Sequence, residues 1–159
     1  KEKFQEPITI ISPDAGGVRR ATTFAKNMEA YVGFVHKKRD PKIHNEVKAF
    51  TVIGEVEDRH AILFDDIIDT GGTIVNAAEA LKNRGAKEVY VYITHGVLSG
   101  DAVKKVEKSV IKKLVITDSI DNNERVKKAR NIEVLTISNL MGEAIKRISN
   151  STSVSDLFK

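Results

Sequence analysis

Short runs of β-branched and other apolar residues alternate with helix-forming segments along almost the whole chain. Six of these runs are four or five residues long and apolar at successive positions, as strands covered on both faces must be. They are Ile8–Ile11, Tyr31–Val35, Ala61–Phe64, Val89–Ile93, Leu114–Thr117 and Val134–Ile137. A seventh run, Phe50–Val56, alternates less regularly and is expected to pair at a sheet edge. The alternation predicts an α/β fold, an open and mostly parallel sheet flanked by helices on both faces.

Three segments between or after these runs repeat their apolar residues with the 3.6-residue period of a helix. The three stripes are Val18, Ala21, Ala25 and Met28; Ile74, Ala77, Ala78 and Leu81; and Leu140, Met141, Ala144, Ile145 and Ile148. No internal repeat, low-complexity tract or interdomain linker interrupts the pattern. A length of 159 residues suits one domain, so residues 1–159 are predicted to form a single domain.

The composition excludes several classes of protein. The chain has no cysteine, which excludes a disulfide scaffold, a thiolate zinc site and a cysteine nucleophile. No apolar run approaches the ~18–20 residues of a membrane span and no signal-peptide pattern opens the sequence, so we expect a cytoplasmic protein without a membrane partner. The formal net charge is +4, which is compatible with anionic ligands.

Residues with functional chemistry follow several of the predicted strands, at the edge of a parallel sheet where ligands bind. The most specific segment is residues 65–73, where Asp65 and Asp66 end a buried strand and the turn Asp69-Thr70-Gly71-Gly72-Thr73 opens a helix. The amides and threonine hydroxyls of such a turn, with the positive end of the helix dipole, can converge on one phosphate. The two carboxylates would repel that phosphate, and they suit sugar hydroxyls or a magnesium ion beside it.

A second turn follows the first predicted strand, at residues 12–17. A pyrophosphate could rest on the amides of Gly16 and Gly17 while Asp14 holds its magnesium ion. Taken alone, this turn is explained equally well as the start of a helix.

Two further segments follow strands at the same edge. Lys37, Lys38 and Arg39 form either a solvated face or a lid that neutralises charge on a transferring phosphoryl group, and their position favours the lid. Residues 94–102 contain His95, which we interpret as structural or loop-anchoring rather than catalytic. The four histidines show no metal-ligand spacing.

Residues 62–73 resemble the phosphoribosyl-binding motif of the type I phosphoribosyltransferases. Together with residues 12–17, Lys37 and Arg39, residues 94–100 and the tail 153–158, they resemble the ribose-phosphate pyrophosphokinase (PRPP synthetase) family. The similarity runs from about Ile8 to Phe158. It implies a type I phosphoribosyltransferase fold and transfer of the β,γ-pyrophosphoryl group of Mg-ATP to the C1 hydroxyl of ribose 5-phosphate, giving 5-phosphoribosyl 1-diphosphate (PRPP) and AMP.

The resemblance also implies a role for each matching residue. Lys37 and Arg39 would form the catalytic lid, with Arg39 also reaching the sugar phosphate. The implied 5′-phosphate ligands are Asp69, Thr70, Gly71, Gly72 and Thr73; the implied ribose and second-magnesium ligands are Asp65 and Asp66; and the implied pyrophosphate turn is Gly16 and Gly17, with Asp14 as a Mg²⁺ ligand. Residues 40–44 and 121–123 depart from the commoner family patterns.

Enzymes of this family are about twice as long and built from two related domains. We therefore expect this chain, which begins at Lys1 without methionine, to be the C-terminal, ribose 5-phosphate-binding half. The other half would supply much of the adenine site, so the fragment is expected to have little activity alone. The full-length protein is expected to be a homo-oligomer.

Three other functions remain open. A phosphoribosyltransferase would consume PRPP rather than make it, and would usually carry a base-specifying hood that we do not find before Ile8 or after Val134. A non-catalytic regulatory subunit would tend to lose the lid cations, whereas Lys37 and Arg39 are both present. With 6% aromatic residues and no basic stripe beyond residues 37–39, a nucleic-acid partner is not expected.

Overall fold

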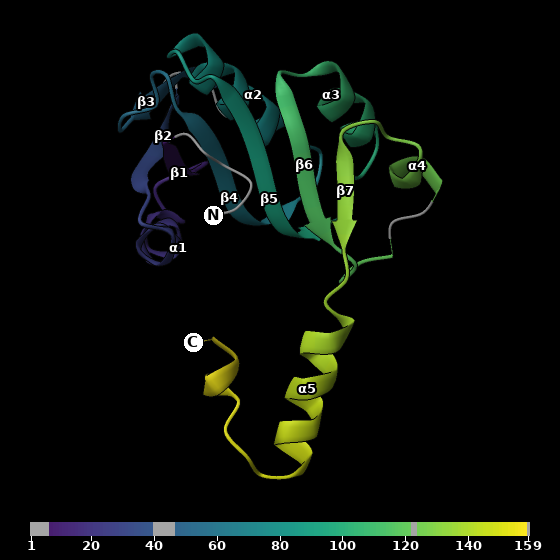
Figure 1. Cartoon of the computed structure of the whole chain (residues 1–159). Helices are drawn as coiled ribbons and strands as arrows, with labels where there is room; N and C mark the ends of the chain where they lie inside the picture. Colours follow the sequence, from purple (N-terminus) through teal and green to yellow (C-terminus); the bar gives the residue numbers. More distant parts are fainter. Residues whose placement is uncertain (1–6, 40–46, 122–123, 159) are drawn as a thin grey trace.

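The computed structural model describes residues 7–39, 47–121 and 124–158, and places seven strands in one sheet (Figure 1). The strand order is β3-β2-β1-β4-β5-β6-β7. The strands are β1 Ile8–Ser12, β2 Tyr31–Arg39, β3 Val47–Ile53, β4 His60–Ile68, β5 Glu88–Gly96, β6 Ile111–Thr117 and β7 Ile132–Leu135. All neighbouring pairs are parallel except β2 and β3, so the predicted mostly parallel sheet and its edge strand are confirmed.

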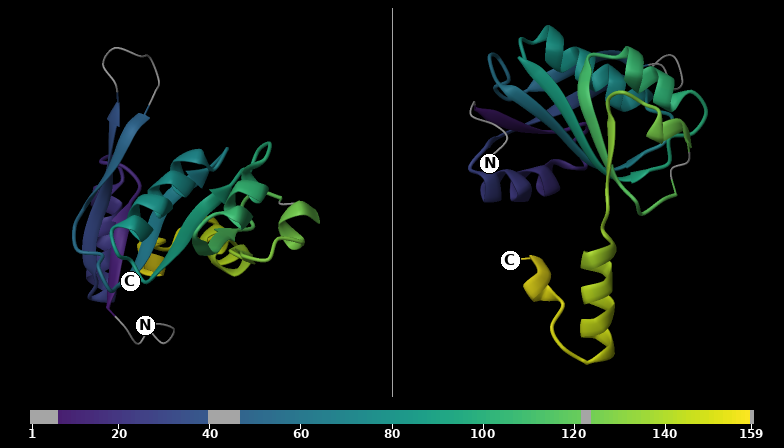
Figure 2. Two further views of the ribbon diagram at one scale, coloured as in Figure 1. Left: turned by 90° about the horizontal axis from the view of Figure 1, so that it is seen from above. Right: turned by 45° about the vertical axis from the view of Figure 1, so that its right-hand side comes forward.

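Helices lie on both faces of the sheet, as the sequence predicts (Figures 1 and 2). The helices are α1 Val18–Met28, α2 Gly72–Asn83, α3 Ala102–Lys108, α4 Glu124–Lys127 and α5 Ser138–Ser149, followed by the 3₁₀ helix η1 Ser155–Phe158. α2 and α3 cover one face and α1 covers part of the other. The sequence patterns missed α3 and α4, which are too short to repeat an apolar stripe.

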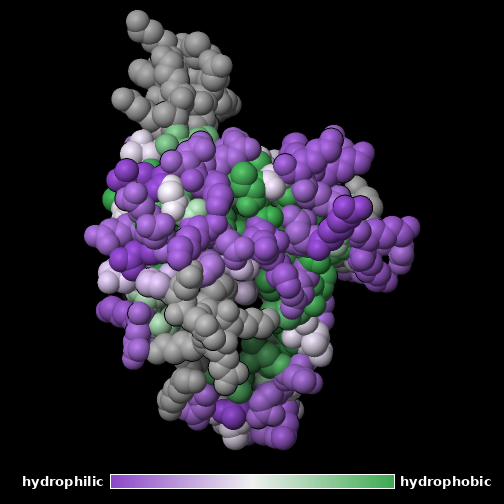
Figure 3. All heavy atoms as spheres, turned by 45° about the horizontal axis from the view of Figure 1, so that its top comes forward, coloured by the Kyte–Doolittle hydropathy of each residue, from purple (hydrophilic) through white to green (hydrophobic). Residues whose placement is uncertain are grey.

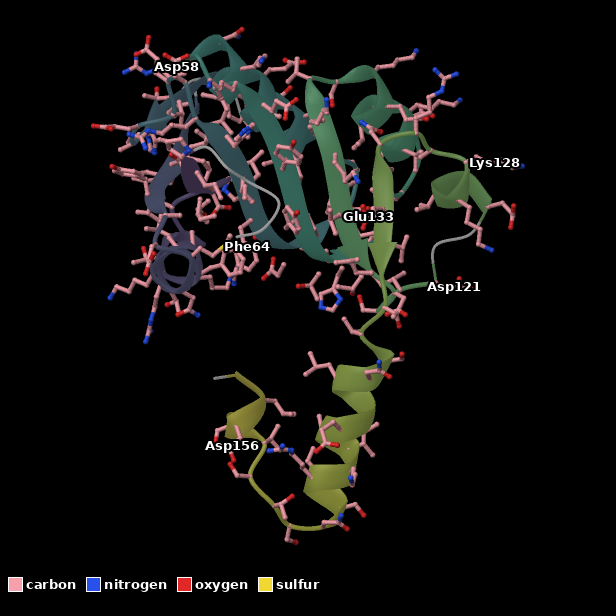
Figure 4. The ribbon with its side chains drawn as sticks, in the orientation of Figure 1. Asp58, Phe64, Asp121, Lys128, Glu133 and Asp156 are labelled. Atoms are coloured by element: carbon pink, nitrogen blue, oxygen red, sulfur yellow. The ribbon has the colours of Figure 1, made fainter. Side chains whose placement is uncertain are left out.

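Alternate residues of the central strands enter two separate hydrophobic cores, because side chains point to opposite faces along a strand. On the face covered by α2 and α3, Ile11 and Leu63 are fully buried in the larger core. On the other face, Ile10 and Ile62 pack in a smaller core with α1. There Phe24 of α1 stacks on Phe64 of β4 with ring centroids 4.6 Å apart; Phe64 is labelled in Figure 4.

Several predicted strand boundaries are wrong. β2 continues past Val35 to Arg39, so Lys37 and Arg39 lie within a strand that pairs with β3 and not in a loop that follows it. β5 and β6 are also longer than predicted, and β3 lies three residues earlier. β4 does not end at Phe64 but continues to Ile68, because it pairs with β5 as far as Gly96. β7 lies two residues earlier than the predicted run Val134–Ile137. There the carboxylate of Asp118 accepts a hydrogen bond from the Ile137 amide at 2.9 Å, which turns the chain out of the sheet.

The last helix, α5, projects away from the sheet (Figures 1 and 2). Its helical period is confirmed, but none of its residues is buried among the described part of the chain. Ile145 and Ile148 in its apolar stripe are 62% and 67% exposed. The face seen in Figure 3 is mainly hydrophilic, with hydrophobic atoms in separate patches near its upper centre and in its lower part. α1, α2 and α3 therefore flank the sheet, whereas α5 lies off it.

The search for membrane spans, which covered the described residues, found no helix with the length and apolar character needed to cross a bilayer.

We expect Gly96→Ala to destabilise the fold, because a Cβ at this position would lie 2.7 Å from Cδ1 and 3.2 Å from Cβ of Ile116. Overpacking of this kind costs about 1–3 kcal/mol of unfolding free energy, measurable by urea denaturation. Gly142→Ala is the control, since a Cβ there would meet nothing within 4 Å and the position lies inside α5. It should leave the unfolding free energy unchanged or raise it by up to about 1 kcal/mol. Equal stability of the two variants would contradict this account of Gly96.

Candidate functional site

The predicted phosphate turn connects β4 to α2. Gly71 has a φ of 75°, a left-handed conformation that glycine adopts without steric cost, and α2 begins at the next residue. The Gly71 carbonyl accepts the Val75 amide at 3.0 Å, which closes the first turn of the helix. The amides of the first residues of α2 therefore point toward the turn, as a bound phosphate requires.

A cavity of about 260 Å³ lies over this turn and is shared by three segments of the chain. Its lining residues are Asp14, Lys37, Asp65, Ile67, Ile68, Asp69, Thr70, Gly71, Gly72, Thr73 and Ile74. The structure thus brings together most of the residues that the sequence singled out. A larger groove of about 740 Å³ lies between β3 and α2, but its lining contains no comparable set of cations, carboxylates and glycines.

Lys37 approaches the phosphate turn from β2, on the other side of β1. Its Nζ lies 3.4 Å from Oγ1 of Thr73, so the ammonium group stands at the start of α2. Arg39 belongs to the same strand, where its backbone pairs with Val47, but its side chain and that of Lys38 lie outside the described residues. Of the predicted lid, the structure therefore places the Lys37 cation.

The second predicted turn, residues 12–17, lies beside the first because β1 and β4 are neighbours. The Ser12 hydroxyl donates to the Asp14 carbonyl at 2.6 Å, and the Gly17 amide donates to Oδ1 of Asp14 at 3.1 Å. A Cβ on Gly17 would come within 2.5 Å of the Ser12 hydroxyl, so the turn requires glycine here. The Asp14 carboxylate thus holds the helix start together, which is the structural interpretation of this turn. Gly16 is exposed beside it.

The acidic pair lies in the last part of β4 rather than after it. The Asp66 amide donates to Oδ1 of Asp65 at 2.9 Å, and Arg20 of α1 forms ion pairs with both carboxylates. Burial raises the pKa of Asp65 above its usual value, and repulsion from Asp66 and Asp14 adds to that shift. This part of the site therefore concentrates negative charge around one guanidinium group.

The bridging position of Arg20 was not predicted from the sequence. The patterns placed Arg20 in the first turn of a helix without a partner, and Asp65 lies 45 residues further along the chain. The sequence held only an indirect sign of this ion pair. The start of a helix that follows β1 and a carboxylate near the end of a neighbouring parallel strand lie at the same sheet edge.

The loop after β5 supports the phosphate turn from the α3 side. The Ser99 hydroxyl donates to Oδ1 of Asp69, and the Ser99 amide donates to the Asp69 carbonyl at 3.2 Å. Lys105 of α3 lies 3.4 Å from the Thr70 carbonyl. His95 makes a 2.9 Å hydrogen bond with Ser119, in agreement with its interpretation as a loop anchor. The sequence resemblance included Ser99 but assigned it no role.

A metal ion at this site would have few protein ligands. The residues that the structure describes contain no group of three or more His, Cys, Asp or Glu side chains that could hold a metal ion. Asp65 and Asp66 nevertheless offer carboxylate oxygens beside the phosphate turn. Mg²⁺ is commonly bound by one or two carboxylates together with water and substrate phosphates, so these residues fit that ion.

The arrangement can bind a phosphorylated sugar. A glycine turn with a helix start and the Lys37 ammonium suits a phosphate, while the carboxylates of Asp65 and Asp66 suit hydroxyl groups or a divalent cation. The two charge types lie side by side along one sheet edge, as the groups of a sugar phosphate do.

Comparison with known proteins agrees with this geometry. Residues 37–159 match the family described as the phosphoribosyl synthetase-associated domain. A ribose-phosphate pyrophosphokinase of Hyphomonas neptunium is 49% identical over 99% of this chain and 51% of its own length. One of Brucella melitensis is 52% identical over 94% of this chain and 47% of its own length. The chain thus spans about half the length of the curated relatives it matches.

Solved structures give the same result for the fold. The phosphoribosylpyrophosphate synthetase of Mycobacterium smegmatis superposes with a TM-score of 0.82 at 33% identity, over 92% of this chain and 46% of its own. An adenine phosphoribosyltransferase superposes with a TM-score of 0.51 at 17% identity, over 69% of this chain and 68% of its own, which shows a shared fold alone. The predicted type I phosphoribosyltransferase fold is confirmed. The chain belongs to the phosphoribosyl synthetase-associated domain family, and the resemblance to ribose-phosphate pyrophosphokinases is confirmed.

Proposed function

We propose that this chain is the ribose 5-phosphate-binding half of a ribose-phosphate pyrophosphokinase. The full-length enzyme transfers the β,γ-pyrophosphoryl group of ATP to the C1 hydroxyl of ribose 5-phosphate, giving PRPP and AMP. The observation that carries this proposal is the position of the Lys37 ammonium beside Thr73, in the same cavity as Asp14 and Asp65.

The 5′-phosphate binds at residues 69–73 in this proposal. The amides at the start of α2 and the hydroxyl groups of Thr70 and Thr73 donate to its oxygens, and the α2 dipole favours its negative charge. The negative charge of the Asp69 carboxylate would repel the phosphate. This carboxylate instead accepts a hydrogen bond from the Ser99 hydroxyl. Asp69 therefore acts as a brace that fixes the turn while its neighbours contact the ligand.

The ribose ring lies along Asp65 and Asp66, whose carboxylates accept hydrogen bonds from its hydroxyl groups. Mg²⁺ is the cofactor we propose, with one ion bound by Asp14 at the pyrophosphate turn and a second bound by Asp65 and Asp66. It would supply charge neutralisation for the transferring group. Gly16 and Gly17 lie where the pyrophosphoryl group would rest. The Gly17 amide donates a hydrogen bond to Asp14, and this bond must break before the amide can donate to the pyrophosphoryl group.

Lys37 and Arg39 act as the cations that close over the transferring group. Pyrophosphoryl transfer depends mainly on positioning and on neutralising charge that spreads over phosphate oxygens in the transition state. β2 carries Lys37 directly to the phosphate turn, so the strand pairing itself supplies that position. Arg39 follows two residues later on the same strand and reaches the sugar phosphate in this proposal.

Because this chain matches only about half the length of its relatives, we also propose that a second half completes the enzyme. The adenine-binding residues would come from that half, so these 159 residues bind ribose 5-phosphate but turn over poorly. The exposed apolar stripe of α5 supports this, since a second domain in the full-length chain would cover it. We also propose that the full-length protein is a cytoplasmic homo-oligomer without a nucleic-acid partner.

A PRPP-forming assay tests the proposed function directly. With ATP, Mg²⁺ and ribose 5-phosphate, the full-length protein should form PRPP and AMP in equal amounts. The 159-residue chain should bind ribose 5-phosphate in a calorimetric titration but form little PRPP. Consumption of PRPP together with a free base would show a phosphoribosyltransferase instead. Rapid PRPP synthesis by the 159 residues alone would contradict the proposed division between two halves.

Thr73→Val should weaken ribose 5-phosphate binding while ATP binding stays near the wild-type value. Valine keeps the shape of threonine but removes the hydroxyl donor, and one hydrogen bond to a charged group is worth about 1.5–3 kcal/mol. Titration of the full-length protein with each ligand measures the two affinities. Thr23→Val in α1 is the matched control, because Thr23 is exposed and its hydroxyl bonds only within its own helix in the described contacts. Equal losses for both ligands would contradict the role of Thr73.

Lys37→Ala should lower the kcat of the full-length protein by at least ~10², the scale of losing one preorganised charge-stabilising group. The KM for ribose 5-phosphate should rise as well, because the ammonium group also lies 3.4 Å from Oγ1 of Thr73 at the phosphate turn. Steady-state kinetics of PRPP formation separate the two effects. The exposed Lys128, labelled in Figure 4, provides the control Lys128→Ala. A kcat near the wild-type value for Lys37→Ala would contradict a catalytic role for Lys37.

A further inference from the structure

Arg20 joins the two carboxylates of the acidic pair through one guanidinium group. Its Nη2 lies 3.2 Å from Oδ1 of Asp65, and its Nη1 lies 3.1 Å from Oδ2 of Asp66. The Arg20 side chain is 52% exposed, while that of Asp65 is 19% exposed. The guanidinium thus contacts one oxygen of each carboxylate, where a ligand of these oxygens would compete with it, while the Asp66 side chain stays 53% exposed.

The same guanidinium also lies beside the pyrophosphate turn. A Cβ placed on Gly17 would be 3.8 Å from Nη2 of Arg20. Arg20 belongs to the first turn of α1, which begins directly after this turn. One cation therefore stands between the carboxylates of β4 and the turn after β1, and a side-chain rotation would carry it from one to the other.

Charge balance explains why Arg20 pairs with the acidic residues in this structure. Asp65 and Asp66 are adjacent, and Asp14 adds repulsion from the neighbouring turn. A nearby cation relieves this repulsion. Sugar hydroxyls or a divalent cation at the same carboxylate oxygens would compete with the guanidinium. A guanidinium released there would suit phosphate oxygens, which it can bind through two parallel N–H groups.

We propose that Arg20 is a shared cation of the two subsites. In the empty site it neutralises Asp65 and Asp66, and in the loaded site it turns to the pyrophosphoryl group at the Gly16–Gly17 turn. This inference rests on the proposed function, because it assigns the two subsites to a divalent cation with ribose and to a pyrophosphoryl group. Binding at the first subsite thereby prepares the second, since the ligand that displaces Arg20 frees it for the anion.

The proposal differs from a purely structural ion pair between α1 and β4. A structural pair would hold the two elements together, and its removal would weaken every ligand to a similar degree. A shared cation competes with one ligand and supports the other, so its removal has effects of opposite sign. The hydrophobic contact of Phe24 with Phe64 already joins α1 to β4 and should keep the fold intact without Arg20.

The experiment measures two probes on wild-type protein and on Arg20→Gln. The probes are free Mn²⁺, followed by electron paramagnetic resonance, and inorganic pyrophosphate with saturating Mg²⁺, followed by calorimetry. We expect Arg20→Gln to bind Mn²⁺ roughly threefold more tightly, the scale of losing one exposed competing ion pair. We expect it to bind pyrophosphate roughly tenfold more weakly, the scale of losing a charge-assisted hydrogen bond.

Arg19→Gln is the matched control, because Arg19 is exposed in the same helical turn and carries the same charge. It should leave both affinities within about twofold of the wild-type values, which separates a specific contact from a general loss of positive charge. Arg20→Lys keeps the charge but not the two-pronged geometry, and it should fall between wild type and Arg20→Gln for both probes.

Two results would overturn the proposal. One is weaker or unchanged Mn²⁺ binding by Arg20→Gln, and the other is an equal response of Arg19→Gln and Arg20→Gln. Failure of the proposed function would look different, because the wild-type chain would then not bind ribose 5-phosphate in a direct titration. The comparison of Arg20→Gln with Arg19→Gln would still decide the role of Arg20 from Mn²⁺ and pyrophosphate alone.

Discussion

The parallel pairing of β1 with β4 is the constraint on which the candidate site depends. The register that sets Ile11 opposite Leu63 makes both strands run toward the same sheet edge, so the turns that follow them lie side by side. Each turn opens a helix, α1 or α2, whose amides and dipole favour anions. Two anion-binding turns next to each other suit a ligand with two phosphorylated parts. β2 pairs with β1 on the other side and brings Lys37 to the same edge.

Charge distribution along this edge is strongly divided. The phosphate turn and Lys37 form a positive region, and Asp65, Asp66 and Asp14 form a negative region beside it. Partial burial of Asp65 beside two other carboxylates costs free energy unless a cation is close, and α1 supplies one in Arg20. In the proposed function, this division orients the sugar phosphate, because its phosphate and its hydroxyl groups are attracted to different parts of the site.

The sequence predicted those features that depend on local pattern. Apolar runs located the strands, and the Gly-Gly turn after Asp69 located the start of α2, because a left-handed residue such as Gly71 leaves a local signature. The features that were wrong or missed depend on residues far apart in the chain. β4 extends past its apolar run because β5 pairs with it, β7 is displaced because Asp118 accepts the Ile137 amide, and Ser99 reaches Asp69 across 30 residues.

The phosphate turn makes its supporting contacts within this chain, whereas the apolar stripe of α5 is left exposed. The residues that hold the phosphate turn all lie within this chain: the brace from Ser99, the cation of Lys37 and the start of α2. α5 keeps the 3.6-residue period of a buried helix but leaves its apolar stripe in solvent. Burying a large aliphatic side chain is worth about 1.5–3 kcal/mol, so a stripe of this kind stabilises a structure only when another surface covers it. The sheet edge thus gathers the groups of the candidate site within these residues, whereas the apolar stripe of α5 lacks a covering surface among the described residues, which agrees with the proposed second half of the enzyme.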